Sequence, residues 1–211
     1  MKTPLKLTTV LAALCAFAIA STNLLAQNIT LPAPQKTGGM PLMEALAKRS
    51  TARNFDAARD LTPLQISNLL WSAFGINRDD GKRTAPSASN RQECDLYVLL
   101  KTGAYLYDAK TNTLTLVVAG DQREIGGTQP FVKNAPVTIL IVADTSRVGK
   151  ETAGEDAGFI SQNMYLYCAS EGLATGVRAS VNRDQIAKVL SLKPAQWVAL
   201  AQSAGYEPKK Q

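Results

Sequence analysis

The sequence predicts one α+β domain, in which helices cover a central sheet. Helical and strand-like hydrophobic patterns are interspersed along the chain without the strict alternation of a parallel α/β fold. Hairpin signals also lie beside a run that reads as a fully buried strand. With 211 residues, 45% of them hydrophobic, the chain is long enough for one well-buried core.

Four segments carry helix signals. In the clearest of them Thr62 is a candidate N-cap, Pro63 takes the first helical position, and Gln65 completes a capping box. Gly75 marks the end of this helix. The predicted helices begin near Pro41, Thr62, Thr152 and Asn182.

The predicted strands follow β-branched and aromatic runs. Residues 104–109 and 113–119 are separated by "KTN", which is typical of a hairpin. Residues 136–143, "PVTILIVA", form a nearly unbroken apolar run and predict a strand covered on both faces. Further strands are expected at 95–100, at 174–181 and from Gln196 onward. The polar stretch 76–93 is long for a connector, which favours a functional loop.

Residues 1–26 have the three-part build of a secretory signal peptide. Lys2 and Lys6 precede an apolar run that is too short to span a bilayer, and small and polar residues follow. Cleavage could follow Ala20 or Ala26, and an uncleaved anchor is the competing interpretation. Export would place the protein in the periplasm or outside the cell, with no membrane span left after leader removal. Residues 27–39, rich in Pro and Gly, are expected to be a mobile lead-in to a domain at 40–211.

Composition excludes several classes of function. Loss of two leader lysines lowers the net charge from +6 to +4, with no basic run of the kind that binds nucleic acid. Histidine is absent, so Ser-His and Cys-His catalysis and His-ligated zinc are excluded. Cys94 and Cys168 could form a bridge, but each lies in an apolar segment, which favours buried free thiols. An enzyme of this composition must use carboxylates, a lysine or a bound cofactor.

The stretch "RSTARNF", residues 49–55, places two guanidinium groups and two hydroxyl groups in one region. Arginine binds phosphate in a bidentate manner, so Arg49, Ser50, Thr51 and Arg53 form a candidate phosphate site. The alternative is a solvated helix end, where basic residues suit the helix dipole.

Three further elements could contribute to a site. "APSASN" offers close backbone approach and an amide, although it could be a plain turn. The N–H groups near Ala179, Ser180 and Val181 could point outward from a helix N-terminus, or Asn182 could simply cap its own helix. The basic tail could add charge or only be solvated. The candidate residues in these elements are Pro86, Ser87, Ala88, Ser89, Asn90, Ala179, Ser180 and Lys209.

Taken in order, these motifs resemble the nitroreductase superfamily of flavin mononucleotide (FMN) proteins. Arg-Ser-Thr-x-Arg follows a first helix, Pro-Ser-x-x-Asn follows a second, and the long helix ends in Glu-Gly-Leu-x-Thr before a basic C-terminus. The hairpin region 96–117 looks like the branch of thiazole- and oxazole-forming peptide dehydrogenases. The resemblance covers about residues 40–210.

The resemblance implies a mixed or antiparallel sheet flanked by helices, in an intertwined homodimer with two FMN sites at the interface. Arg49, Ser50 and Thr51 would hold the phosphate and ribityl end, and Arg53 would lie near the pyrimidine edge of the ring. Residues 87–90 would reach the flavin from the partner subunit. The pair 179–180 would donate backbone N–H groups to the ring, with more side-chain bulk than the glycines often found there in the family.

The activity implied is ping-pong hydride transfer between a small electron donor and an acceptor, with no catalytic side chain required. A nicotinamide donor is scarce outside the cytoplasm, which fits poorly with export. The rival interpretation is a non-catalytic module that keeps the fold and binds flavin or another anion.

Overall fold

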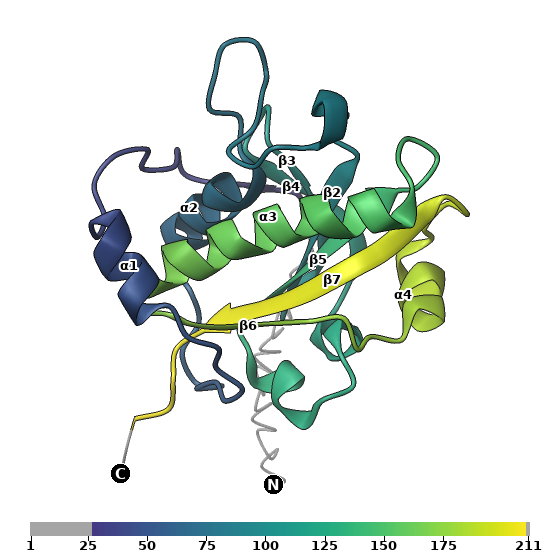
Figure 1. Ribbon diagram of the computed structural model, residues 1–211. Coiled ribbons are helices and arrows are strands. Elements are labelled where there is room, and N and C mark those ends of the chain that lie inside the picture. Colours follow the sequence, from purple (N-terminus) through teal and green to yellow (C-terminus); the bar gives the residue numbers. More distant parts are fainter. Residues whose placement is uncertain (1–26, 210–211) are drawn as a thin grey trace, which may run out of the picture.

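The computed structural model describes residues 27–209 as one layer of sheet between helices (Figure 1). The predicted leader, residues 1–26, and the last two residues lie outside this range. Seven strands form a single sheet in the order β1-β4-β3-β2-β5-β7-β6, and every neighbouring pair is antiparallel. The predicted α+β class, with an antiparallel sheet flanked by helices, is confirmed.

The predicted helices and strands are present in the predicted order, with small shifts at their ends; β1 and the three 3-10 helices were not predicted. The strands are β1 (Ile29–Thr30), β2 (Cys94–Leu100), β3 (Gly103–Asp108), β4 (Thr113–Ala119), β5 (Val137–Asp144), β6 (Ala174–Arg178) and β7 (Gln196–Gly205). The α-helices are α1 (Leu42–Lys48), α2 (Pro63–Phe74), α3 (Lys150–Ser170) and α4 (Arg183–Leu190). Three short 3-10 helices complete the described chain: η1 (Ala88–Asn90), η2 (Arg123–Gly126) and η3 (Pro130–Asn134).

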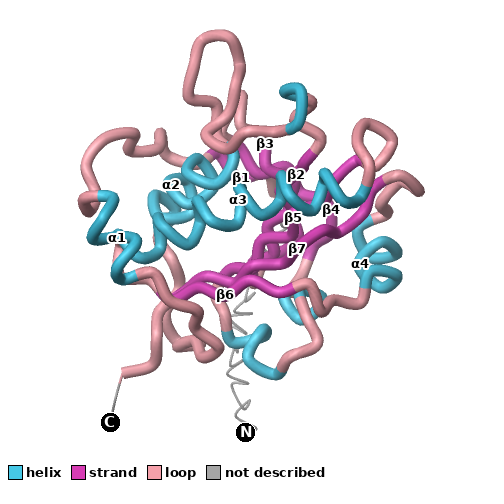
Figure 2. Tube along the Cα trace, viewed as in Figure 1, coloured by secondary structure: helices cyan, strands magenta, loops and turns pink. Residues whose placement is uncertain are grey.

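Both faces of the sheet are covered. On one face α2 and α3 pack on the sheet, and Leu69, Ile141 and Ile160 are fully buried between these layers. On the other face α4 and η2 bury Leu140 and Ile186. Strand β5 lies between them and is buried along nearly its whole length, as its unbroken apolar run predicts. Figure 2 shows how α3 runs across the sheet.

The capping box at the start of α2 is present. The Thr62 hydroxyl accepts from the Gln65 backbone N–H, and the Gln65 side chain accepts from the Thr62 N–H at 2.9 Å. Such a cap stabilises a helix by about 1 kcal/mol. The helix ends at Gly75, whose N–H donates to the Trp71 carbonyl.

The lead-in, residues 27–39, is docked on the domain and is not the mobile arm that its Pro and Gly content suggested. Residues of β1 pair with Thr113 and Leu114 of β4, and Leu31 is only 5% exposed. The Gln35 N–H donates to Asn68 Oδ1 at 2.8 Å. The reason is that "ITL" supplies a β-branched pair and a leucine to the sheet edge, and the prolines follow it.

Cys94 and Cys168 are both free and buried, on β2 and α3. Burial raises the pKa of the Cys94 thiol and raises that of Cys168 to about 12, so both are unreactive thiols. Among residues 27–209, no helix is long and apolar enough to cross a membrane. The same range holds no group of three or more Cys, Asp and Glu side chains placed for a metal ion.

Candidate functional site

The arginine segment, residues 49–53, lies along the edge strand β6. The Ala52 N–H donates to the Thr175 carbonyl at 2.8 Å, so this part of the segment continues the sheet beyond β6. A side chain at Gly176 would have no room, since an added Cβ would lie 2.4 Å from the Ala52 carbonyl oxygen. Glycine at this position therefore permits the close approach of the two backbones.

The hydroxyl of Tyr165 joins α3 to both backbones. It lies 2.9 Å from Thr51 Oγ1 and accepts from the Val177 N–H at 3.1 Å. Sequence reasoning did not single out Tyr165, which is only 6% exposed.

Arg49 and Arg53 have no anionic partner within residues 27–209. The ion pairs in that range join Lys82 to Asp80, Lys101 to Asp60 and Arg123 to Asp121. The Arg49 guanidinium lies 5.2 Å from the centroid of the Tyr165 ring and is half-buried, while Ser50 and Arg53 are exposed. Two unpaired guanidinium groups beside an exposed hydroxyl are suited to an anion such as a phosphate.

The basic tail leaves the domain beside the arginine segment. The Tyr206 carbonyl accepts from the Asp56 N–H at 2.8 Å, and the Arg59 guanidinium lies 3.5 Å from the centroid of the Tyr206 ring. Lys209 follows three residues later and is exposed. The structure therefore brings the tail to the same side of the molecule as Arg49–Arg53.

Ala179 and Ser180 lie just beyond the other end of β6 and are exposed. The expectation that the Val181 N–H also points outward is wrong, because this group donates to the Ala179 carbonyl at 3.0 Å. Asn182 caps α4 by accepting from the Gln185 N–H at 3.1 Å. Ala179 lies four positions beyond Thr175, the residue that bonds Ala52, which is about 13 Å at the usual strand rise.

Arg178, the last residue of β6, is a buried cation that sequence reasoning did not single out. Its guanidinium donates to the Gly126 carbonyl at 2.8 Å and to Ser203 Oγ at 2.9 Å. Burial lowers the pKa of Arg178 to about 10, so the group stays charged at neutral pH. No signal in the sequence distinguished it, since it follows an apolar strand as a solvated arginine would.

Residues 86–90 lie away from the arginine segment in the same chain. The Ala88 N–H donates to Asp156 Oδ2 of α3 at 2.9 Å, whereas Thr51 is bonded to Tyr165 of the same helix. Nine positions separate Asp156 from Tyr165, a rise of about 13 Å. Within one chain, the structure therefore does not unite the second motif with the first.

Comparison with known proteins identifies the family. The model of the nitroreductase family matches residues 46–206. The chain belongs to the nitroreductase family. A candidate nitroreductase from Ralstonia eutropha JMP134 is 40% identical, with a TM-score of 0.82 over 87% of this chain and 91% of that one. A candidate nitroreductase from Methanocaldococcus jannaschii is 26% identical over 72% of this chain and 85% of its own length.

One similar nitroreductase structure comes from Clostridium difficile R20291 and is named an FMN-dependent nitroreductase. It is 18% identical, with a TM-score of 0.58 over 80% of this chain and 89% of that one. At that identity the likeness shows the fold alone. Family membership makes the protein an oxidoreductase of nitroreductase type.

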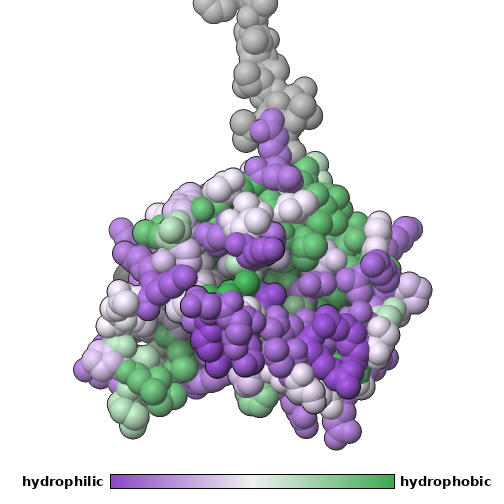
Figure 3. Space-filling view, turned by 90° about the horizontal axis from the view of Figure 1, so that it is seen from above, coloured by the Kyte–Doolittle hydropathy of each residue, from purple (hydrophilic) through white to green (hydrophobic). Residues whose placement is uncertain are grey.

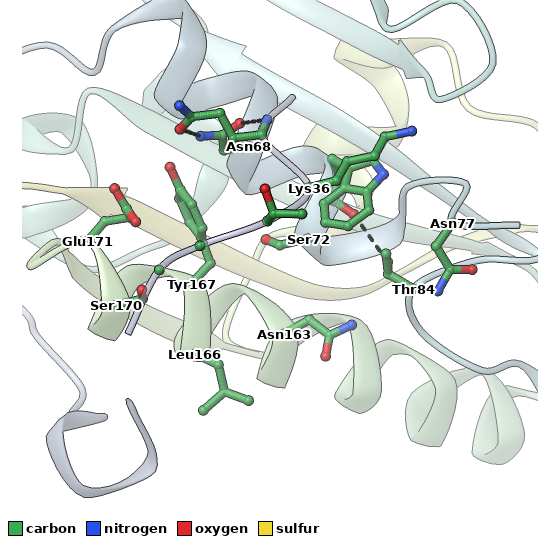
Figure 4. A pocket seen from close by; sticks show the side chains of 15 residues that line it. Lys36, Asn68, Ser72, Asn77, Thr84, Asn163, Leu166, Tyr167, Ser170 and Glu171 are labelled. Carbon is green, nitrogen blue, oxygen red and sulfur yellow. Dashed lines mark hydrogen bonds between the residues drawn. The ribbon is translucent and has the colours of Figure 1, made fainter. Parts of the chain in front are cut away.

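A groove of about 390 Å³ lies elsewhere on this nitroreductase-family domain, between the lead-in, α2 and α3 (Figure 4). Lys36 Nζ lies 5.9 Å from the centroid of the Trp71 ring on one side, and Asn163 and Tyr167 line the α3 side. The lining offers one cation, Lys36, and one carboxylate, Glu171. It can bind a small polar molecule, but it lacks the paired guanidinium groups that match a phosphate.

The connector predicted at 76–93 is a surface loop with exposed charged side chains at its tip. Viewed from above, the molecule shows hydrophilic side chains across the middle of this face and hydrophobic patches toward its margins (Figure 3). A short bridge between Ile76 and Arg83 closes the loop, and the Asn77 N–H donates to the Lys82 carbonyl at 3.2 Å within it.

We predict that Gly176→Ala loosens the arginine segment. The new methyl group would press on the Ala52 carbonyl, and overpacking of this kind lowers the free energy of unfolding by about 1 to 3 kcal/mol. Thermal and urea unfolding measure the effect. Gly154→Ala on α3 is the matched control, because its added methyl group has no atom within 4 Å and should be neutral or slightly stabilising. Equal stability of the two variants would contradict the close approach described above.

Proposed function

We propose that this protein is an FMN-dependent oxidoreductase. The observation that carries the proposal is the pair of unpaired arginines, Arg49 and Arg53, held beside the β6 edge of a nitroreductase-family domain. The FMN-dependent relative of the same fold supports the choice of cofactor. The narrower placement, in the branch of the peptide dehydrogenases, rests on the hairpin region 96–117 and stays a prediction.

The arrangement of these residues suits an elongated ligand that carries a phosphate at one end only. Arg49, Ser50 and Lys209 would hold its phosphate at the start of β6. Arg53 would lie toward the ring, and Ala179 and Ser180 lie about 13 Å along the strand, where the far end of an extended ligand would reach. Bound flavin supplies hydride transfer to and from small molecules.

The protein's own contribution is to bind and orient. Tyr165 fixes the rotamer of Thr51 and ties the arginine segment to α3. Arg178 places a permanent positive charge within the sheet edge near 179–180, where it favours negative charge on a neighbouring ligand. No side chain of the site is required as a proton donor or nucleophile.

A homodimer follows from the same proposal. Residues 87–90 lie about 13 Å along α3 from the arginine segment of their own chain and make no hydrogen bond to it, so we assign them to the flavin site of a second copy, as the family resemblance implies. Exposed apolar side chains on α1 and α3, two helices in contact with each other, form a candidate contact face: Leu42, Met43 (75% exposed) and Leu46 on α1, and Phe159 (49% exposed) on α3. An isologous contact would cover this face on both copies.

Export is proposed from the leader sequence alone, since residues 1–26 lie outside the described structure. In the periplasm or outside the cell, the donor would be a small quinol, a reduced thiol or a redox partner, because nicotinamide pools are cytosolic. The rival function is a flavin- or anion-binding module without turnover. Reduction of the bound flavin by a donor, followed by its reoxidation by an acceptor over many cycles, separates the enzyme from the carrier.

Arg49→Ala should weaken FMN binding about ten- to a hundredfold, because a charge-assisted contact contributes about 1.5 to 3 kcal/mol. Flavin fluorescence titration of the apoprotein measures the dissociation constant. Lys110→Ala, in the exposed turn between β3 and β4, is a control for loss of one positive charge and should bind as the wild type does. Unchanged affinity in Arg49→Ala would remove the phosphate assignment.

The FMN-loaded protein should have the mass of a dimer in light scattering at micromolar concentration. Met43→Lys should shift it toward the monomer and release flavin, because a charge would be buried in the apolar contact. Glu124→Lys, which changes the charge of an exposed residue of η2, is the control. A monomer that retains flavin would show that residues 87–90 do not act across subunits.

Cell fractionation of the full-length protein tests export. We expect a periplasmic or secreted protein whose N-terminal residue follows Ala20 or Ala26. Replacing the apolar residues Leu11 and Leu14 by Arg should block export and leave the leader in place. Recovery of wild-type protein with Met1 in the cytosolic fraction would refute export and make a nicotinamide donor the default.

A further inference from the structure

Two buried carboxyl groups lie beneath the loop that contains residues 86–92. Glu93, directly before β2, is 2% exposed, and Asp156 of α3 is 4% exposed. Neither makes an ion pair within residues 27–209. Buried carboxylates without a cation are costly, so the pair needs an explanation.

A hydrogen bond between the two carboxyl groups would require a proton. Asp156 Oδ2 accepts from the Ala88 N–H at 2.9 Å, and Glu93 Oε1 lies 3.6 Å from the Cys94 thiol. Glu93 Oε2 has no donor among the described residues. The Asp156 carboxyl is close enough to interact with the Glu93 side chain. Two acceptors can form a hydrogen bond only if one of them carries a proton.

Electrostatics around the pair point in the same direction. Burial is the largest cause of the raised pKa of the Glu93 carboxyl. Its own backbone N–H opposes the shift, and the hydrogen bond and charge of Asp156 add to it. The neighbouring charges do not offset this, because Arg147 donates to the backbone carbonyls of Arg91 and Gln92. On the β5 side, the Asp144 N–H bonds the Glu93 carbonyl, and Arg83 bonds the Gln92 side chain. Cys94 and Asp95, on the same strand, add no positive charge.

The loop above the pair has a strained backbone that depends on stabilising contacts. Ser89, Asn90 and Gln92 have φ angles of 52°, 54° and 46°, in the left-handed region that residues other than glycine seldom adopt. Such a conformation persists only where surrounding contacts over-determine it. On the α3 side the contact is the bond from Ala88 to Asp156, and within the loop the Gln92 N–H donates to Ser87 Oγ at 2.9 Å.

We propose that Glu93 carries a proton that it donates to Asp156, and that this shared proton holds the 87–90 loop in the shape that contacts the partner subunit's flavin. Glu93 and Asp156 are thus positioning residues for a site on the other subunit. The inference deepens the proposed function and rests on it for the identity of the ligand, but the shared proton is a property of the chain alone.

The direction of the pH effect follows from linkage. A carboxyl group whose pKa is raised by folding binds its proton more tightly in the native state, so its contribution to stability is full below the ordinary glutamate pKa of 4.5. The contribution is lost as the pH rises through the raised pKa of Glu93. Loop order, and with it FMN affinity, should decline over the same interval.

The test compares the wild-type dimer with Glu93→Gln from about pH 5 to about pH 9. The amide donates to Asp156 at every pH, so it imitates the protonated acid without titrating. We expect FMN affinity of the wild type to fall about tenfold across the titration, and that of Glu93→Gln to stay level. Glu124→Gln, an exposed carboxyl of η2, should follow the wild type. Parallel curves for wild type and Glu93→Gln would overturn the proposal.

A second pair of variants tests whether the bond from the Ala88 N–H to Asp156 holds the loop. Asp156→Asn can still accept from Ala88 and donate to Glu93, so its FMN affinity should stay within about twofold of the wild type, whereas Asp156→Ala should lose about tenfold. Equal FMN affinities in the two variants would overturn the role of Asp156 in holding the loop.

The free energy of unfolding of the flavin-free protein, measured over the same pH range, tests the shared proton separately from the proposed FMN-dependent function. A pH dependence that Glu93→Gln removes supports the shared proton, even if FMN fails to bind at any pH, and in that case only the proposed function is lost. A pH dependence that Glu93→Gln leaves unchanged overturns the shared proton.

Discussion

A chain of buried hydrogen bonds joins α3 to the arginine segment, and the position of the site depends on it. Ser161 of α3 donates to the Gln202 side chain at 2.7 Å, and the Gln202 amide donates to Thr175 Oγ1 at 3.0 Å. The Thr175 carbonyl in turn accepts from the Ala52 N–H. Buried polar groups lose free energy when left unpaired, so each bond in this chain constrains the next. The positions of α3, β7, β6 and the arginine segment are thereby fixed relative to one another.

The long helix also sets the distance between the two halves of the site. Near its C-terminus Tyr165 holds the arginine segment, and nearer its N-terminus Asp156 holds the 87–90 loop. A rigid helix keeps these points apart, so no side-chain motion within one chain can unite them. A two-fold axis that crosses α3 would bring each loop to the opposite copy's arginines, since an isologous contact exchanges the two ends of the same element. The exposed Phe159 lies between these two positions in sequence.

Much of the fold could be predicted from sequence because it depends on local chemistry. Thr62 and Gln65 form their capping box wherever the helix packs, and the short unbroken apolar run of β5, rich in β-branched residues, favours a buried strand. The arginine segment was found because guanidinium and hydroxyl groups are adjacent in the chain. Contacts between distant residues could not be found in this way. Tyr165, Gly176 and Arg178 act through the β6 edge, and Glu93 meets Asp156 across 63 positions of sequence. The lead-in was misjudged for the same reason, since its partner strand lies more than eighty residues away.

The way in which the sheet ends has a consequence for the protein in solution. A free strand edge is a template on which another chain can add, and long exposed edges lead to aggregation. Here one edge is β1, which has only two residues and is followed by prolines that cannot donate to a neighbour. The other edge is β6, which Ala52 and the Tyr165 hydroxyl already occupy. The contacts at the β6 edge shape the candidate ligand site, and those at the β1 edge dock the lead-in. Both sets of contacts also prevent another chain from adding to the sheet.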